Sequence, residues 1–240
     1  MNLKLLSALI LVGVGATWNA AAVDVFTIEQ SDYQFVNMAG QREHVLLGEW
    51  AKHLIGNQCD TVTWDHLNSD KGPVYLECET KKPSTLKYVH DDLVQKNQAR
   101  INNEVANMES DNKQLAKLQE KLELAKTVNE KHKLQQDIKR VYLMIDDEKQ
   151  TIQGFKQLEG YMMPAALEVR FLFDTNLAGH YEPRDAGLTF VPDKNTPKSV
   201  KRKNTVLLED AADMLMQGYT MEDVMKENRR NMNELYDHLF

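Results

Sequence analysis

The chain has 240 residues, with 36 acidic and 29 basic side chains and a formal net charge of −7. This length fits one domain, or one modest domain with an appendage, since a domain spans roughly 100–200 residues. The net negative charge disfavours general nucleic-acid binding, which depends on neutralising phosphates, so we expect no nucleic-acid partner. Hydrophobic residues make up 42% of the chain, which excludes wholesale disorder, and only 11 Gly and 6 Pro disfavour a protein built mostly of short strands and turns.

The first 22 residues have the layout of a secretory signal peptide. Lys4 gives a positive start, Leu5–Trp18 is an uncharged and mostly apolar run, and Ala20–Ala22 supplies small residues before Val23. The apolar run has 14 residues, whereas a membrane-spanning helix needs about 20. We therefore predict cleavage after Ala22 and a mature chain with a net charge of −8 and no transmembrane segment. The predicted location is outside the cytoplasm, in a bacterial periplasm.

Cys59 and Cys78 are the two cysteines of the chain, and an oxidising compartment favours a bond between them. Two β-prone runs, 60–64 and 73–77, flank the polar turn 68–72, which predicts a hairpin with one cysteine on each arm. Neither cysteine belongs to a Cys-x-x-Cys pair, so the structural bond is favoured over a redox or nucleophilic thiol. Closing a loop of this length stabilises a fold by about 3 kcal/mol.

Residues 84–153 contain neither Gly nor Pro, which is far too long for a loop and predicts helix. Their apolar residues recur in two heptad series, as in a coiled coil. The first series contains Val94, Ile101, Met108, Leu115 and Leu122 with Leu118 and Ala125, and the second contains Leu134, Val141 and Phe155 with Ile138, Ile145 and Ile152.

The two series are out of frame by two residues, which one continuous seam accommodates poorly because a stutter inserts four residues and a stammer three. This favours a helical hairpin over 90–160 with its turn near 126–133, which we call the predicted arm. One continuous helix that pairs with another chain is the alternative. Between residues 90 and 158 there are 12 acids and 12 bases, so the charge of the mature chain comes from the flanking regions.

The regions around the predicted arm read as parts of a small head. Residues 41–56 predict an amphipathic helix that ends at Gly56, and 86–89 fits a short strand or the entry to the long helix. After the arm, 167–173 alternates as a half-buried strand and 187–191 is a second strand candidate. We therefore predict a helix-dominated α+β fold. Its disulfide-stapled head comprises 23–89 and, within 161–192, the strands that complete one antiparallel sheet.

The C-terminal region begins with a polar basic linker, 193–204, which contains Lys198, Lys201, Arg202 and Lys203. This linker is interpreted as a solvated loop, with contact to an anionic surface as the alternative. Residues 205–240 predict two amphipathic helices. The first carries Leu208, Ala211, Ala212 and Leu215 and ends at Gly218, and the second is capped by Thr220 with Asp223.

Four methionines of this C-terminal pair are candidate partner-docking residues, since methionine-rich faces can form adaptable grooves. A methionine stripe at helical spacing is also typical of plain core. The four are Met214, Met221, Met225 and Met232.

Motifs that carry chemistry are scarce. Ser84–Lys87 matches S-x-x-K and 110–112 matches S-D-N, but the K-T-G element that completes the set is missing, so both matches are interpreted as chance. The seven histidines lack metal-ligand spacing, and no phosphate-binding glycine loop or EF-hand loop occurs. The sequence thus predicts no catalytic, cofactor-binding or metal residue.

A leader, a small head and a helical arm make this layout similar in architecture to periplasmic assembly factors and to jawed holdase chaperones. We expect a non-enzymatic periplasmic scaffold, adaptor or assembly factor, for example within an envelope-spanning secretion or transfer machine. It would bind protein partners in the cell envelope or self-associate through the arm. A holdase chaperone for exported proteins is the first alternative, and an enzyme of undetected type is the second.

Overall fold

The computed structural model describes residues 29–36, 39–55, 57–66, 74–175, 181–197 and 205–239. The predicted signal peptide, its cleavage site after Ala22, the turn 68–72 and the linker residues Lys198, Lys201, Arg202 and Lys203 lie outside these residues. The chain divides into two compact units. Among the described residues, we call the first unit the head (29–86, 165–191 and 197–239) and the second the arm (87–164, with 192–196).

The head contains a five-stranded antiparallel sheet in the order β3-β4-β5-β6-β7. The strands are β3 (Thr61–His66), β4 (Val74–Thr80), β5 (Pro164–Thr175), β6 (Tyr181–Pro192) and β7 (Thr205–Leu208). β4 precedes the arm and β5 follows it, and the two pair with Leu76 opposite Phe171. The predicted fold class, helix-dominated α+β with a small antiparallel sheet completed from both sides of the arm, is thus confirmed.

One face of this sheet is buried because apolar side chains alternate along each strand. In β4 every second residue from Val74 to Thr80 is buried. The same alternation runs through β6, where Leu188 and Phe190 are buried, and through β7, where Val206 and Leu208 are buried. The opposite face carries half-buried or exposed residues, and we call it the open face.

The N-terminal part of the head differs from the predicted helix over 41–56. Residues Arg42–Leu46 form strand β2, which pairs with β1 (Asp32–Val36), and helix α2 covers only Leu47–Leu54. The apolar pattern of a short segment fits a strand or a helix, and here pairing with a strand that the sequence analysis missed overrides the helical interpretation. The helix nevertheless keeps its buried face, with Leu47, Trp50 and Leu54 fully buried.

Trp50 of α2 is the centre of an aromatic cluster on the buried face of the sheet. Its ring lies edge-on to those of Phe171 and Phe173 in β5, with centroids 5.1 and 5.5 Å apart. Tyr33 of β1 approaches it at 6.2 Å, and Trp64 of β3 lies 5.7 Å from Phe173. These aromatic contacts, three of them edge-to-face and the Trp64–Phe173 contact tilted, connect four separate elements into one core.

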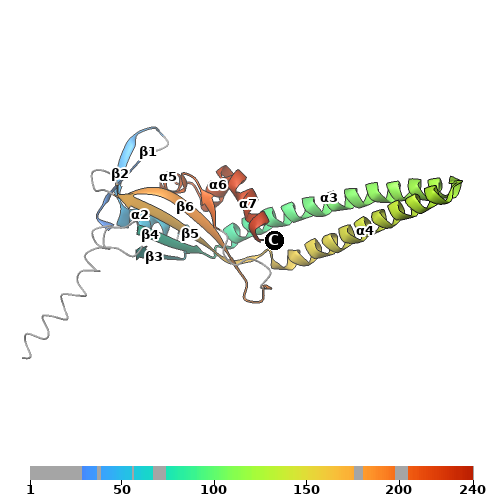
Figure 1. Cartoon of the computed structure of the whole chain (residues 1–240). Helices are drawn as coiled ribbons and strands as arrows, with labels where there is room; N and C mark the ends of the chain where they lie inside the picture. The colour runs from blue at the N-terminus through green and yellow to red at the C-terminus, as the bar shows by residue number, and fades with distance from the viewer. Residues whose placement is uncertain are drawn as a thin grey trace, which may run out of the picture. The chain divides into compact units, whose positions relative to one another are not determined.

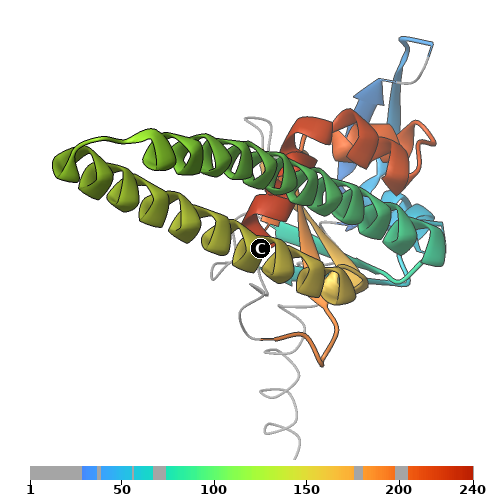
Figure 2. The ribbon, with the colours of Figure 1, turned by 90° about the vertical axis from the view of Figure 1, so that its right-hand side faces the viewer.

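The arm consists of α3 (Pro83–Leu124) and α4 (Val128–Leu158), followed by the short 3-10 helix η1 (Glu159–Tyr161). The two long helices run side by side in opposite directions, as the green and yellow ribbons show (Figure 1), and a second view agrees (Figure 2). Residues 125–127 form the turn between α3 and α4, at the start of the predicted turn region. Thr127 caps α4, since its side chain accepts a hydrogen bond from the Glu130 backbone N–H at 3.2 Å.

The interior of the arm is narrow. Leu115, Val141 and Ile145 form a buried cluster, with the half-buried Met108, Leu118 and Ile138 packed against it. These residues come from both predicted heptad series, one on each helix. The coiled-coil interpretation of the seam stays a prediction. Between the first part of α3 and the end of α4, the Asn97 side chain is fully buried and donates a hydrogen bond to the Phe155 carbonyl at 2.9 Å.

The C-terminal region holds a strand and three helices where two helices were predicted. Leu208 belongs to β7 rather than to a helix, and α5 (Ala211–Met216), α6 (Met221–Glu227) and α7 (Arg229–Leu239) follow. The predicted second helix divides at Asn228, whose side chain bonds both Val224 in α6 and Glu209 after β7. Gly218 has φ +89° at the end of α5, and Thr220 and Asp223 form the predicted capping box.

Candidate functional site

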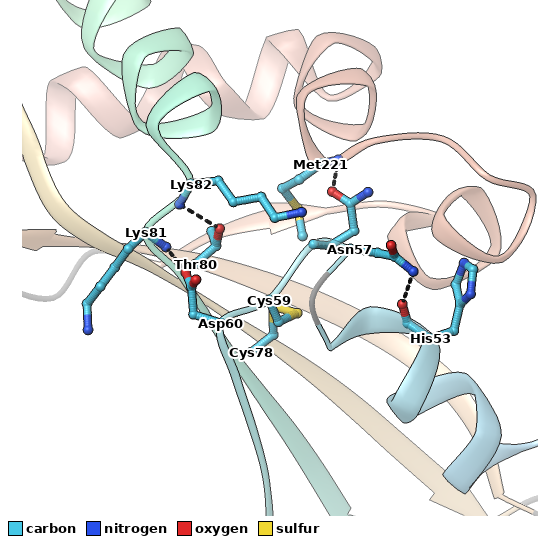
Figure 3. The surroundings of a disulfide bond; sticks show 10 residues. His53, Asn57, Cys59, Asp60, Cys78, Thr80, Lys81, Lys82 and Met221 are labelled. Atoms are coloured by element: carbon cyan, nitrogen blue, oxygen red, sulfur yellow. Dashed lines mark hydrogen bonds between the residues drawn. A yellow bond between two sulfur atoms is a disulfide. The ribbon is translucent and has the colours of Figure 1, made fainter.

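The two cysteines form a structural bond inside the head (Figure 3). Their sulfur atoms lie 2.00 Å apart and both residues are fully buried, Cys78 within β4 and Cys59 just before β3. The neighbouring Gln58 accepts a hydrogen bond from the Met221 backbone N–H at 3.1 Å, which connects this corner to α6. The predicted staple is therefore present, and no free thiol is available at this position for chemistry.

The four methionines proposed for docking lie mostly in the core. Met221, Met225 and Met232 are buried, and Met214 is half-buried. These positions match the plain-core interpretation of the stripe for three of the four residues. Docking through Met214 stays a prediction.

A small acidic pocket lies between β6 and α5. Asp185, Asp210 and Asp213 line it, and its volume is about 60 Å³. The Tyr33 hydroxyl donates a hydrogen bond to the Asp213 carboxylate. Burial, that hydrogen bond and the Asp213 charge all raise the pKa of Tyr33, so the phenol stays protonated. A space this small holds a water molecule or two, whereas small-molecule sites span roughly 300–1,000 Å³.

A larger, open hollow of about 310 Å³ lies on the open face of the sheet. Its lining residues are contributed by four strands: Tyr75 from β4, Arg170 and Leu172 from β5, Asp185, Ala186 and Gly187 from β6, and Thr205 and Leu207 from β7. Arg170 and Asp185 are the charged residues of this lining, the other lining residues are uncharged, and Leu207 is 44% exposed. We call this surface the sheet hollow.

Two contacts shape the sheet hollow. A Cβ at Gly187 would collide with the Thr205 Cγ2, so any larger residue there requires the Thr205 side chain to move where β6 and β7 approach. Arg170 lies over the Tyr75 ring at 5.2 Å and pairs with Glu77, which holds the guanidinium at one side of the depression. The resulting surface suits an apolar side chain of an extended peptide better than a charged metabolite.

The two long helices and the turn between them expose large apolar side chains at two places. Leu124 and Val128, which we call the tip pair, flank the turn and are 72% and 83% exposed. Tyr142, Leu143 and Met144, which we call the outer patch, are 51%, 63% and 45% exposed on α4. All five fall outside the two heptad series, which is the sequence signal that could have found them.

The arm also contains a carboxylate layer between its helices. Glu148 of α4 lies one heptad after the core residue Val141, and an oxygen of its carboxylate is buried without a hydrogen-bond partner. An oxygen of the Asp111 carboxylate on α3 is likewise buried without a hydrogen-bond partner. Burial, and then the charges of Asp111, Glu104 and Asp147, raise the pKa of Glu148. This layer weakens the seam when its members are ionised.

The remaining sequence motifs do not converge in the part of the chain that the structure describes. Ser84–Lys87 forms the first turn of α3, while 110–112 lies some 25 residues further along the same helix. Within the described ranges no group of three or more His, Cys, Asp and Glu residues could hold a metal ion. None of the described helices is both long and apolar enough to cross a membrane.

Comparison with protein families, curated proteins and solved structures finds no match for this chain. The function therefore has to be inferred from the surfaces described above.

Proposed function

We propose that the mature chain is a non-enzymatic periplasmic adaptor that binds a protein partner of the cell envelope through the tip of its arm. The exposed tip pair is the observation that supports this role. Single exposed apolar residues are common on protein surfaces and need no explanation. Here, however, two large aliphatic side chains project on both sides of one turn, while Ala125 between them is buried.

The surroundings of the tip pair suggest what the partner is like. The exposed charged residues around the turn are of both signs: Lys121, Lys126 and Lys131, with Glu120, Glu123 and Glu130. A partner with an apolar pocket and a rim that carries both basic and acidic residues would bury Leu124 and Val128 and complement these charges. Such a protein would be an assembly component in the envelope, for example in a secretion or transfer machine.

The experiment is site-specific photocrosslinking in cells that export the protein. A photoreactive residue at position 128 should yield a discrete crosslinked product, and the same residue at Gln114, exposed on α3, should not. Adding L124S to the chain that carries the probe at 128 should abolish the product without changing the amount of exported protein. Equal patterns from positions 114 and 128, or no product from either, would refute docking by the tip.

The sheet hollow favours a second candidate, a holdase that binds extended apolar segments of exported clients. This role predicts suppression of the aggregation of an unfolded outer-membrane protein by the purified chain. The substitution L207K, which places a charge in the hollow, should remove that suppression, whereas V128K should preserve it. An inactive wild-type chain in this assay would rule the holdase out while leaving the adaptor role intact.

A further inference from the structure

The outer patch interrupts an otherwise polar helix surface. Val141 and Ile145 face the seam and are buried, so the three residues between them cover the remaining sides of α4. Leu143 lies opposite the seam, at the centre of the outward face. Nothing within the arm requires a large aliphatic side chain at this position, because the hydrophobic cluster is built from Leu115, Val141 and Ile145.

Charged residues are arranged around Leu143 with opposite signs at equal distances. Arg140 and Lys139 precede it by three and four residues, and Asp146 and Asp147 follow it by three and four. Residues at these spacings share one face of a helix. The outward face of α4 therefore has a basic half, an apolar centre and an acidic half.

The same relation continues further from the centre. Asp137 and Lys149 lie six residues before and after Leu143, and Glu130 and Lys156 lie thirteen before and after. With 3.6 residues per turn, these four lie roughly 120–140° around α4 from Leu143 and therefore outside its outward face. All four pairs of charged residues at matching distances are therefore opposite in sign. On the outward face, the uncharged Gln136 and Gln150 are matched at seven residues, and His132 is matched by Gly154 at eleven.

We propose that the outer patch is a self-association surface, on which α4 of a second copy of this chain packs antiparallel about a two-fold axis at Leu143. An axis at this position places each residue opposite the one equally far on the other side of Leu143, as in any isologous interface. Leu143 then packs on its own copy. Arg140 meets Asp146 of the second copy, and Lys139 meets Asp147.

The charged groups are available for this pairing. Lys139, Arg140 and Asp147 are exposed and form no ion pair or hydrogen bond within the described residues. Asp146 accepts one hydrogen bond from Gln150 of its own helix, at 3.0 Å, which leaves the carboxylate free to accept more. A second copy would therefore meet groups that the chain itself does not neutralise.

Gly154 fits the same arrangement. It lies on the outward face in the interior of α4, where glycine disfavours helix, and a Cβ built on it would have no neighbour within 4 Å. The packing of this chain therefore does not require glycine there. In the proposed pair it lies opposite His132 of the second copy and leaves room for the imidazole.

The test is sedimentation equilibrium of the mature chain, residues 23–240, together with paired charge reversals. The interface is one helix face, so we expect a weak dimer that forms as the concentration rises to about 0.5 mM. Both K139E/R140E and D146K/D147K should weaken association by about tenfold or more, because each makes the two facing halves alike in charge. The matched control K113E/K117E reverses two exposed lysines of α3 and should leave self-association unchanged.

Mixing the two reversed chains is the decisive step. The K139E/R140E chain carries acids on both sides of Leu143, and the D146K/D147K chain carries bases on both sides. The mixture should therefore form a heterodimer, although neither chain dimerises by itself. The variant with all four reversals should recover self-association, and L143S should lose it. A circular dichroism spectrum confirms that each variant keeps its helices.

A wild-type chain that stays monomeric at about 0.5 mM, a dimer that tolerates both reversals, or a mixture that stays monomeric would overturn the proposal. A monomer whose position 143 crosslinks to a different protein would assign the outer patch to that partner and would also overturn it. The inference rests on the proposed role of the arm as an interaction element, but uses different residues. Its failure would leave crosslinking from position 128 unchanged, and loss of that crosslink would leave the dimer unchanged.

Discussion

The head and the arm bury apolar side chains in different ways. In the head, Trp50, Phe171 and Phe173 are fully buried and each touches rings from other elements. In the arm, the best-buried residues of the central cluster retain a few per cent exposure, and the seam includes ionisable groups such as Glu148. A three-dimensional core supports one cooperative transition, whereas a two-helix seam can open locally. The head is thus the more stable region, and the arm is the region whose local stability can be changed by single groups in its seam.

The substitution W50A tests the head most severely. Removing a fully buried aromatic side chain costs about 3–5 kcal/mol of unfolding free energy, since the cavity between α2 and β5 cannot close. Urea unfolding of the mature chain followed by tryptophan fluorescence, from Trp50 and Trp64 in the wild type and from Trp64 alone in the variant, should show this loss. The control Y142A, at an exposed position of the arm, should change the free energy by less than about 0.5 kcal/mol. A loss below about 1 kcal/mol for W50A would show that the aromatic cluster is not central.

Removing the disulfide should have the next largest effect. The cysteines are 19 residues apart, and loss of the crosslink through C59A/C78A should cost about 3 kcal/mol through the greater entropy of the unfolded chain. The same urea titration measures this loss. Hydrogen exchange of the amides of residues 100–150 should stay as in the wild type, because the bond lies in the head. Faster exchange in that range would contradict the separation between head and arm.

The substitution I145A should have the opposite effect and destabilise the arm while leaving the head unchanged. Ile145 is buried in the central cluster of the arm, and its truncation should cost about 2 kcal/mol, at the lower end for a buried aliphatic residue because so narrow a seam can partly close around the gap. Exchange of arm amides should then accelerate by roughly thirtyfold. The urea transition reported by tryptophan fluorescence should not move. If that transition shifts as far as it does for C59A/C78A, the two regions unfold as one unit.

The comparison of head and arm also explains what the sequence could predict. The arm was predictable because heptad periodicity is local, and the frame shift between the series of Val94 and Leu134 marked two helices. The cysteine hairpin was predictable for a similar reason, since two short β-prone runs flank a polar turn and each arm carries one cysteine. Strand candidates on both sides of the arm likewise predicted that strands pair across it. The turn at 125–127 was predictable only approximately, although Thr127 and Glu130 resemble a capping box.

Other parts of the head depend on contacts between distant residues. Nothing local distinguishes Arg42–Leu46 as a strand, because its partner β1 decides the conformation. The sequence pattern predicted Leu208 in a helix, but the residue belongs to β7 because it pairs with β6. The sheet hollow brings together residues from four strands, so no sequence window contains it. The tip pair and the outer patch, in contrast, were visible as apolar residues outside the heptads.

The smallest predicted effect concerns the carboxylate layer and depends on pH. The pKa of Glu148 is raised in the folded arm, mainly by burial and then by the charges of Asp111, Glu104 and Asp147. A group whose pKa is higher in the folded state stabilises that state while it is protonated, and this contribution is lost as the pH rises through the folded-state pKa. Seam stability should therefore be greater in mild acid than at neutral pH.

The substitution E148Q removes the charge and keeps the shape, so it should slow exchange of the arm amides at neutral pH relative to the wild type. The difference should shrink as the pH falls towards the ordinary range of a glutamate, because the wild-type side chain then becomes neutral as well. Exchange rates at each pH are compared with those of unstructured peptides to remove the intrinsic dependence. The control E109Q, at an exposed position of α3, should show no such effect. If E148Q instead left exchange unchanged at neutral pH, the carboxylates would be well solvated, and the adjustable stability of the arm would have to arise from its narrow apolar seam alone.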